Sequence, residues 1–369
     1  MALVQAAGFV SPDDPNEYNA SYKYVPPMVF GLVDGEGNFT FVKNALPELL
    51  TNSSAVKGAD FDRDGDIDLF VGSRVRPLFY PQGENSYILR NDSAPGQPRF
   101  SEVTSSVIPE LGAESLVSDA IWTDFNGDFW PDLIVMSEWS PIRIFENQQG
   151  LLREITAQSG IADYTGWWNS IAAADLDNDG DTDYIAGNFG ENIFFQCSTE
   201  EPLRIYAKDL DNNGSLDPFI SCYWPDSLGR RHEYLYHPLQ DVIKQFVGIR
   251  KNINTFAEYG EATVDDIFAG GELDDALQRS ANWMKTSWIE NKDNGQFAIH
   301  PLPKEAQFAP AYGLLPIDVD QDGLLDIVMV GNDHGTEVQH GRADAAIGLL
   351  FQNEGQGRFP PLSLDASHF

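Results

Sequence analysis

A nine-residue acidic motif occurs five times in this chain, and each copy is followed by a short apolar run. The copies read DFDRDGDID, DFNGDFWPD, DLDNDGDTD, DLDNNGSLD and DVDQDGLLD, at residues 60–68, 124–132, 175–183, 209–217 and 318–326. Runs such as LFVG and LIVM, rich in Val, Ile and Phe, are typical of buried strands. Apolar residues also precede most copies, as in AIWTDF. Each motif is therefore expected to be a loop that joins two strands.

A second pattern alternates with the first and predicts a hairpin: a strand, a turn with Asn and Gly, and a more polar strand. Its copies cover residues 29–42, 87–104, 143–156, 287–300 and 349–362, with a degenerate copy at 193–208. One acidic loop and one hairpin give four strands. Four-stranded units repeated in series favour a β-propeller, which protects its strand edges by radial closure. A two-sheet sandwich is the alternative, but it does not account for a repeated four-stranded unit.

We therefore predict an all-β fold, a β-propeller of six to seven four-stranded blades built from five units and a leading partial one. Residues 1–28 are a candidate to complete the first blade, and residues 29–369 form the propeller. Between Trp224 and Trp288 the strand pattern stops, and apolar residues take the spacing of helices. We expect a small helical insertion within one blade there, at about residues 225–287.

The motif has the composition of a metal-binding loop. Carboxylates fall at positions 1, 3, 5 and 9, Gly stands at position 6 in four of the five copies, and the carbonyl of position 7 can add a ligand. Hard oxygen ligands in a flexible loop suit Ca²⁺ better than Mg²⁺. An EF-hand is excluded, because it needs a bidentate Glu at position 12, which is apolar in every copy here. Acidic turns without metal are the alternative, but five copies with constant internal spacing argue against it.

The predicted ligands of up to five Ca²⁺ ions are positions 1, 3, 5, 7 and 9 of each motif. They are Asp60, Asp62, Asp64, Asp66, Asp68, Asp124, Asn126, Asp128, Trp130, Asp132, Asp175, Asp177, Asp179, Asp181, Asp183, Asp209, Asp211, Asn213, Ser215, Asp217, Asp318, Asp320, Asp322, Leu324 and Asp326. Loops 60–68, 175–183 and 318–326 have carboxylates at positions 1, 3, 5 and 9, whereas the other two loops have one fewer. Ligand charge tunes calcium affinity, so the first three should bind more tightly. Phe129, which replaces the expected Gly, is expected to strain its turn.

At these residues the chain resembles the FG-GAP/VCBS repeat family, the integrin-α-like calcium propellers, over residues 29–363. The stretches AIWTDFNGDFWPDL, TGWWNSIAAADLDNDGDTDYIAGN and AQFAPAYGLLPIDVDQDG look most similar to bacterial propellers that accompany the ASPIC/UnbV module, related to cartilage acidic protein. No such module is evident in this sequence. The resemblance implies calcium binding, an extracellular, cell-surface or periplasmic location, a role in adhesion or recognition, and one portion of a longer exported protein.

The charge balance excludes other classes of partner. Lys and Arg number 23 against 57 Asp and Glu, a net charge of −34, which disfavours nucleic acid and anionic membranes. No run of 18 apolar residues predicts a membrane span, and the first residues lack the pattern of a signal peptide. Two cysteines exclude a disulfide scaffold and a Cys-rich zinc site. Cys197 and Cys222 either pair in an oxidising compartment or stay as two thiols.

If the acidic loops lie at one end of the blades, the connections between the second and third strands lie at the other. Those connections are varied, at 72–86, 137–142, 225–287 and 331–348, and variable loops on a rigid scaffold commonly carry recognition. We therefore expect a polar or anionic protein or glycan partner on the face opposite the calcium loops, or else a solvated set of loops without a ligand. The predicted ligand-binding residues are Arg74, Arg76, Tyr80, Trp139, Arg230, Arg231, His232, His237, His334, His340 and Arg342.

Two classes of function follow: a calcium-stabilised extracellular recognition or adhesion module, or a carbohydrate-active enzyme, a polysaccharide lyase or hydrolase, on a propeller. The segment RRHEYLYH (230–237) gathers groups that a lyase could use, and GNDHGTEVQHGR (331–342) could bind a transition metal. No HExxH or GxSxG motif occurs, so no catalytic residue is assigned. The pair Trp167 and Trp168 either stacks on a sugar or packs in the core.

Overall fold

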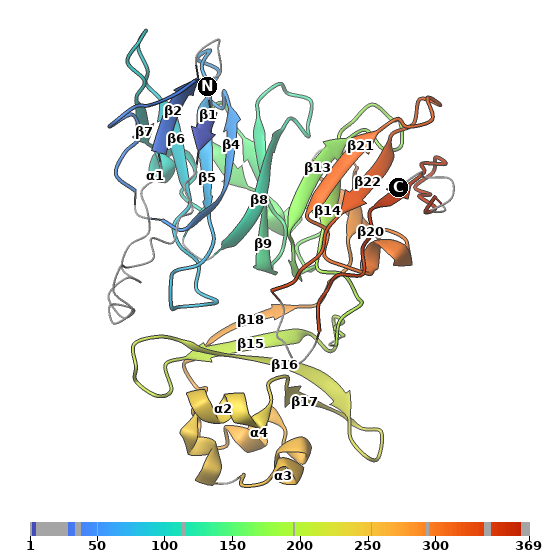
Figure 1. The fold of residues 1–369 in the computed structure, drawn as a ribbon. Coiled ribbons are helices and arrows are strands. Elements are labelled where there is room, and N and C mark those ends of the chain that lie inside the picture. The colour runs from blue at the N-terminus through green and yellow to red at the C-terminus, as the bar shows by residue number, and fades with distance from the viewer. Residues whose placement is uncertain are drawn as a thin grey trace.

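The computed structural model describes residues 2–4, 29–33, 38–49, 51–112, 115–194, 196–251, 253–292, 295–335 and 341–362. Most of the regular structure is β, in several four-stranded antiparallel sheets, and the helices are few and short (Figure 1). The predicted all-β class is confirmed. Among the described residues, no helix is long and apolar enough to cross a membrane.

The first two large sheets are built from consecutive strands. One has the order β4-β5-β6-β7, from β4 (Ser53–Ala59), β5 (Asp68–Ser73), β6 (Tyr87–Asn91) and β7 (Phe100–Glu102). The next joins β8 (Leu116–Thr123), β9 (Asp132–Ser140), β10 (Arg143–Asn147) and β11 (Leu152–Glu154), with β12 (Gly166–Trp167) paired to the end of β9. In both sheets the acidic motif joins the first strand to the second, as expected.

The next two sheets have four strands and three strands. The third contains β13 (Ser170–Ala174), β14 (Asp183–Gly187), β19 (Ser287–Asn291) and β20 (Phe297–Pro301), and the last contains β21 (Gly313–Ile317), β22 (Asp326–Val330) and β23 (Leu349–Phe351). At the N-terminal end, β1 (Ala2–Val4) pairs with β2 (Val29–Val33), which pairs with β3 (Phe39–Phe41). Most of the predicted segment 1–28 lies outside the described residues.

We call the sheets that begin with β4, β8, β13 and β21 the main sheets. Their first strands lie side by side in chain order: β4 beside β8, β8 beside β13, and β13 beside β21. This is the succession expected of propeller blades. The strand pairing of the described residues closes no ring, so the count of six to seven blades stays a prediction. Short helical segments sit between strands: α1 (Thr104–Val107), η2 (Thr156–Gln158) and η4 (Lys304–Gln307).

The insertion is larger than the sequence suggested. Residues 188–286 leave the third sheet after β14 and return at β19, and the two strands are neighbours in the sheet. The insertion therefore begins before residue 225, and it includes the fourth acidic motif, which we had assigned to a blade. The sequence misplaced this boundary because alternation of residues reveals a strand but not its partner. The partner of β14 is β19, which lies about 100 residues further along the chain. We call residues 188–286 the inserted module.

The inserted module has a sheet and a helical layer of its own. The sheet has the order β17-β16-β15-β18, from β15 (Leu203–Lys208), β16 (Asp217–Pro225), β17 (Arg231–Leu235) and β18 (Leu277–Ala281). The helices are α2 (Leu239–Gln245), η3 (Val247–Lys251), α3 (Phe256–Glu261) and α4 (Val264–Ile267). Phe219 of β16 packs with Leu239, Val242 and Ile267 beneath the helices. Helices therefore lie in this region, as predicted.

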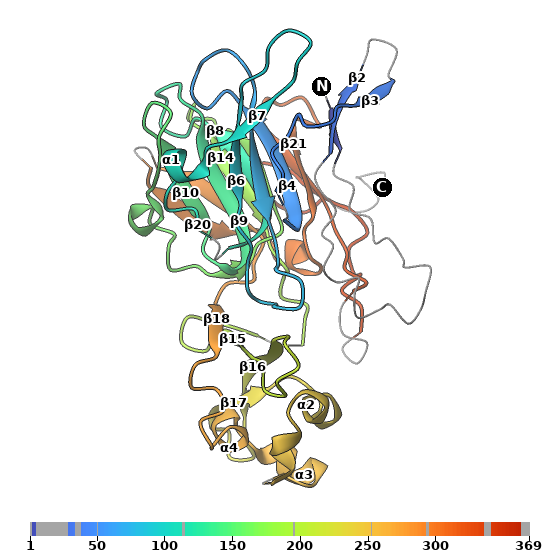
Figure 2. The same ribbon diagram turned by 90° about the vertical axis from the view of Figure 1, so that its left-hand side faces the viewer.

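The opposite face of the module's sheet packs against the main sheets. Ile205 and Cys222 share one core cluster with Leu116 and Trp139. The Arg279 side chain donates from Nε to the carbonyl of Pro81 at 3.0 Å, and the Asn282 backbone N–H donates to the carbonyl of Thr165 at 2.9 Å. Figures 1 and 2 show the module as a lobe at one end of the main sheets. Because β9 begins at an acidic loop and ends at Ser140 beside the module, this end lies opposite the four acidic loops of the main sheets.

The two adjacent tryptophans belong to the core. Trp168 is fully buried, and its Nε1 donates to the carbonyl of Ser140 at 3.1 Å. The ring of Trp167 packs edge-on against Trp139 and Phe189, with centroids 4.9 and 5.0 Å away. Burying each large side chain stabilises the fold by about 1.5–3 kcal/mol. Packing therefore explains Trp168, whereas Trp167 packs against the core and stays half-buried.

Candidate metal centre

All five acidic loops share one backbone conformation. Positions 4 and 6 have positive φ in every loop: Arg63 and Gly65, Gly127 and Phe129, Asn178 and Gly180, Asn212 and Gly214, and Gln321 and Gly323. Two left-handed residues bend the chain sharply, and Gly adopts this conformation without steric cost. The side chains at positions 1 and 3 consequently come close together in four of the loops.

Two hydrogen bonds recur in each loop. The N–H of position 6 donates to the Asp at position 1, as from Gly65 to Asp60 Oδ2 at 3.1 Å, and the same bond spans 2.8–3.2 Å in the other loops. The N–H of position 2 donates to Oδ2 of the Asp at position 9, as from Phe61 to Asp68 at 3.3 Å, with four equivalents. The loop geometry is thus fixed by the motif itself.

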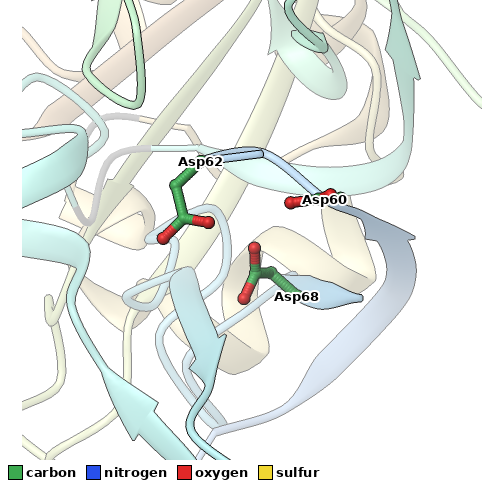
Figure 3. A group of neighbouring side chains, drawn as sticks. All are labelled: Asp60, Asp62 and Asp68. Carbon is green, nitrogen blue, oxygen red and sulfur yellow. The ribbon is translucent and has the colours of Figure 1, made fainter. Parts of the chain in front are cut away.

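Three carboxylates converge in four of the five loops. Each group offers ligand atoms within 4.8 Å of one another, and Figure 3 shows Asp60, Asp62 and Asp68 turned toward a common point. The other groups are Asp175, Asp177 and Asp179; Asp209, Asp211 and Asp217; and Asp318, Asp320 and Asp326. This is the donor set that hard cations prefer.

Some carboxylate oxygens within these loops accept no hydrogen bond. Oδ1 of Asp60 and Oδ1 of Asp175 are buried and accept no hydrogen bond. Burial raises the pKa of Asp62 and Asp177, and the adjacent carboxylates of Asp64 and Asp179 raise it further. Unpaired buried oxygens and mutual repulsion both destabilise the ionised loop. A bound cation would relieve both, so the residues present fit a divalent metal.

The aspartates at position 9 are the most buried of the set. Burial raises the pKa of Asp68 and Asp132 to about 7 and that of Asp183 to about 6, against the usual 3.8. Backbone N–H groups oppose this rise, because they donate to both oxygens of each carboxylate. Position 9 is therefore tied to the sheets as well as to the loop.

Loop 124–132 departs from the others. It forms no group of three acidic side chains with such close ligand atoms, because Asn126 stands at position 3. Phe129 at position 6 has a φ of 69° and its side chain is 79% exposed. A left-handed conformation costs a residue with a Cβ roughly 1–2 kcal/mol. The structure therefore places the expected strain at Phe129.

Four asparagines that sequence reasoning treated only as turn residues hold the position-9 aspartates. The backbone N–H groups of Asn91, Asn147, Asn291 and Asn353 donate to Oδ1 of Asp68, Asp132, Asp183 and Asp326 at 2.7–2.8 Å. Each Asn ends the third strand of its sheet or follows it closely. The recurrence of Asn at this place in the hairpins was the signal that could have found them.

The predicted ligand-binding residues do not form one site. Tyr80 and Trp139 lie at the boundary with the inserted module, where Trp139 Nε1 donates to the Tyr80 hydroxyl at 2.7 Å. Tyr80 donates to Glu138 at 3.3 Å, and Arg74 forms an ion pair with the same carboxylate. Burial raises the pKa of both Tyr80 and Glu138. Trp139 and Glu138 are buried at this boundary, whereas the Arg74 side chain is 48% exposed, and the sequence did not single out Glu138.

Other predicted residues lie within the inserted module. Arg230 pairs with Asp226 at 2.7 Å, Arg231 pairs with Glu201 at 2.6 Å, and His232 lies 3.5 Å from Asp226. The Nε2 atom of His237 accepts the backbone N–H of Ile220 at 2.9 Å. The segment 230–237 thus engages its polar groups in local contacts.

The rest of the set lies near the ends of the main sheets. Arg76 stacks on Phe79 with 4.1 Å between guanidinium carbon and ring centroid, His334 is 3.8 Å from Asp344, and Arg342 is exposed. His340 lies outside the described residues. Both cysteines are free thiols, and burial raises the pKa of Cys197 to about 12 and of Cys222 to about 11.

A family model described as an FG-GAP-like repeat matches residues 124–186. This stretch is an FG-GAP-like repeat. It contains the second and third acidic motifs and the strands that flank them. The repeat is consistent with the sheet succession described above, and it covers one part of the region over which the sequence resembles the family.

Comparisons with curated proteins and with solved structures add no family assignment. No curated protein matches the chain. Among solved structures, it is similar to one titled "Crystal structure of BBS1N in complex with ARL6DN, soaked with lead", with 11% identity over 76% of this chain and 89% of that chain and a TM-score of 0.21.

Proposed function

We propose that this chain is a calcium-stabilised recognition or adhesion module that works outside the cell, at the cell surface or in the periplasm. The observation that carries the proposal is the convergence of three aspartates in each of four loops, at positions 1, 3 and 9 in three of them and at positions 1, 3 and 5 in loop 175–183. The FG-GAP-like repeat at 124–186 supports it, because such repeats are typical of extracellular propellers. The finer likeness to VCBS and ASPIC/UnbV-associated propellers, and membership of a longer exported protein, belong to the same proposal.

In each loop, the side chains at positions 1, 3, 5 and 9, of which Asn126 and Asn213 are amides and the rest carboxylates, would hold the ion together with the carbonyl at position 7. Bound Ca²⁺ supplies positive charge that neutralises the cluster and crosslinks the loop. Loops 60–68, 175–183 and 318–326 have the most carboxylates and should bind most tightly. Loop 124–132, without a close acidic group, should bind least tightly.

Thermal unfolding in millimolar Ca²⁺ and in excess EDTA tests the calcium proposal. A cation that binds only the folded state stabilises it by about 2.7 kcal/mol per site at a hundredfold excess over Kd. We expect a rise of at least about 5 °C in Tm with Ca²⁺, and a smaller rise with Mg²⁺. An identical Tm in Ca²⁺ and EDTA would contradict the proposal.

Paired variants test the ranking of the sites. Asp177→Ala removes a carboxylate from a complete cluster, whereas Asn126→Ala removes an amide at the same position of loop 124–132. The calcium-dependent rise in Tm should shrink more in the first variant than in the second. Equal losses would show that carboxylate number does not set affinity here.

Recognition calls for a partner screen, with glycan and protein arrays probed in Ca²⁺ and in EDTA. Arg76, Arg231 and Arg342 remain exposed after the module covers Tyr80 and Trp139. Replacing these three by Ala should weaken binding of an anionic or polar partner at least tenfold. Binding that is undiminished, or independent of Ca²⁺, would count against a calcium-stabilised recognition surface at this end.

A further inference from the structure

The side-chain amides of three asparagines cross from one sheet to the acidic loop of the preceding sheet. Asn147 Nδ2 donates to the carbonyl of Phe61 at 2.8 Å, Asn291 to that of Phe125 at 2.8 Å, and Asn353 to that of Leu176 at 2.7 Å. Each acceptor is position 2 of an acidic motif. The asparagines are 1% exposed, so these bonds lie in the interior.

Each amide also holds the loop of its own sheet. The second hydrogen of Nδ2 goes to the carbonyl of position 8: Pro131 at 2.8 Å, Thr182 at 3.3 Å and Leu325 at 3.1 Å. One side chain therefore joins two neighbouring acidic loops. In the following text we call these three residues the bridging asparagines.

Together with the hydrogen bonds to the aspartates at position 9, these contacts form one continuous chain of hydrogen bonds from loop 60–68 to loop 318–326. In loop 60–68, the N–H of Phe61 holds Asp68, and its carbonyl accepts from Asn147. The N–H of Asn147 in turn holds Asp132. The same links repeat through Phe125 and Asn291, and through Leu176 and Asn353, until Asp326 is reached.

Apolar packing runs in parallel with the hydrogen bonds. The side chains at position 2 enter the core of the next sheet: Phe61 clusters with Phe145, and Phe125 contacts Phe297 with centroids 5.7 Å apart. Leu176 clusters with Phe351. Val319, at position 2 of the last loop, is 48% exposed and receives no bridging asparagine among the described residues. Backbone and side chain of position 2 therefore both connect a loop to its neighbour.

The loop of the inserted module is outside this chain of hydrogen bonds. Leu210 donates to Asp217 at 2.9 Å, as in the other loops, but among the described residues no hairpin asparagine holds Asp217. Its neighbour is the connection 72–86, where the N–H of Leu216 donates to the carbonyl of Leu78 at 2.9 Å. This loop is an internal control, because it has the same motif and receives no bridge from any part of the chain that the structure describes.

We propose that the bridging asparagines couple the acidic loops of adjacent sheets, so that ordering one loop raises the cation affinity of the next. The calcium part rests on the function proposed above. A loop ordered by a cation fixes position 2, which fixes the bridging asparagine and, through its N–H, position 9 of the next site. The bridging asparagines act as positioning residues. Loops 60–68 to 318–326 should fill cooperatively, and loop 209–217 should fill independently.

The test uses the position-6 glycine amides of four of the five loops as reporters: Gly65, Gly180, Gly214 and Gly323. They are followed in ¹H–¹⁵N spectra of the full chain during a Ca²⁺ titration. Asn353→Ala is expected to raise the Ca²⁺ concentration at the midpoint of the Gly180 titration, in the neighbouring sheet, about fivefold or more. The midpoint at Gly214 should not move. An unchanged midpoint at Gly180 would overturn the coupling.

Asn91→Ala is the matched control. Asn91 holds Asp68 through its N–H, and its Oδ1 accepts from Ser93, as Asn147 and Asn353 accept from Gly150 and Gly355 in their hairpins. Among the described residues, however, the Asn91 amide makes no bond to another sheet's loop. It should leave Gly180 unchanged. If Asn353→Ala does not fold, Asn353→Asp, which keeps the shape and removes the donor, replaces it, with Asn91→Asp as its control.

Hydrogen exchange in EDTA separates failure of the coupling from failure of calcium binding. Without the bridge, the Leu176 carbonyl loses one buried hydrogen bond. The bond from the Leu176 N–H to Asp183 should then open more often, so that this amide exchanges about tenfold faster, and Asn91→Ala should not change it. If the glycine amide signals of the natural chain do not shift when Ca²⁺ is added, the calcium proposal fails. The exchange rates then decide by themselves whether the loops are coupled. Equal rates at Leu176 in the variant and the natural chain would refute the coupling.

Discussion

The acidic loop of the inserted module and the four loops of the main sheets share a motif but not an environment. Their backbone turns and the bonds from positions 6 and 2 are the same. The main-sheet loops are additionally held by a hairpin asparagine, and three of them receive a bridge from the next sheet. The comparison shows that nine residues suffice to shape the loop, whereas burial and coupling come from neighbouring sheets.

The largest expected difference in stability between the main-sheet loops and the module loop comes from the side chain at position 2 of the motif. Phe61 is 1% exposed and stacks near Trp122, whereas Leu210, its equivalent in the module, is only half-buried. Phe61→Ala should lower the free energy of unfolding by about 3–5 kcal/mol through a core cavity, and Leu210→Ala by clearly less. Urea unfolding in EDTA measures both. Equal losses would mean that the module loop is packed as firmly as the others.

A second contrast concerns arginines. Arg143 in β10 makes two bonds to Glu154, reaches the carbonyls of Leu111 and Glu110, and has a side chain only 13% exposed. Arg231 in the module pairs with Glu201 while 44% exposed. Arg143→Ala should cost about 2 kcal/mol or more, and Arg231→Ala about 0.5 kcal/mol, in urea unfolding. A larger loss for Arg231→Ala would reverse this ranking of the two regions.

A smaller effect should appear as a pH dependence of the metal-free chain. Burial raises the folded-state pKa of Asp68, Asp132 and Asp183 to about 6–7, above the usual 3.8. Their contribution to stability is complete below pH 3.8 and is lost as pH rises through 6–7. In EDTA, the free energy of unfolding should fall by at least about 1.4 kcal/mol between pH 5 and 8, and Ca²⁺ should reduce the fall. Stability in EDTA that rises over this range would contradict the assignment.

Local features of this molecule could be predicted from the sequence. The strands that flank each acidic motif, the all-β class and the FG-GAP-like repeat at 124–186 follow from periodicity and residue type within a few tens of residues. The left-handed turn at Phe129 was expected for the same reason, because the Gly of the motif is replaced there.

Long-range features could not be predicted. The bridge from Asn147 reaches Phe61 across 86 residues, and no local pattern identifies the acceptor. The burial of Tyr80, Trp139 and Glu138 depends on where the inserted module docks. The start of that module was misplaced because its strands have the same alternation as those of the main sheets. In each case the missing information is which segments pair.

The pairing of β14 with β19 sets an order of assembly. Sheets β4–β7 and β8–β11 can form from strands that follow one another closely, but the third sheet needs partners as far apart as Asp183 and Asn291, 108 residues along the chain. During synthesis, the edge of β14 stays without its partner until the whole module has emerged. The module's separate core of Phe219 and its helices can form first and shorten the gap to be closed. Slower folding of the module's core should therefore delay formation of the third sheet, although the module and that sheet share no strand.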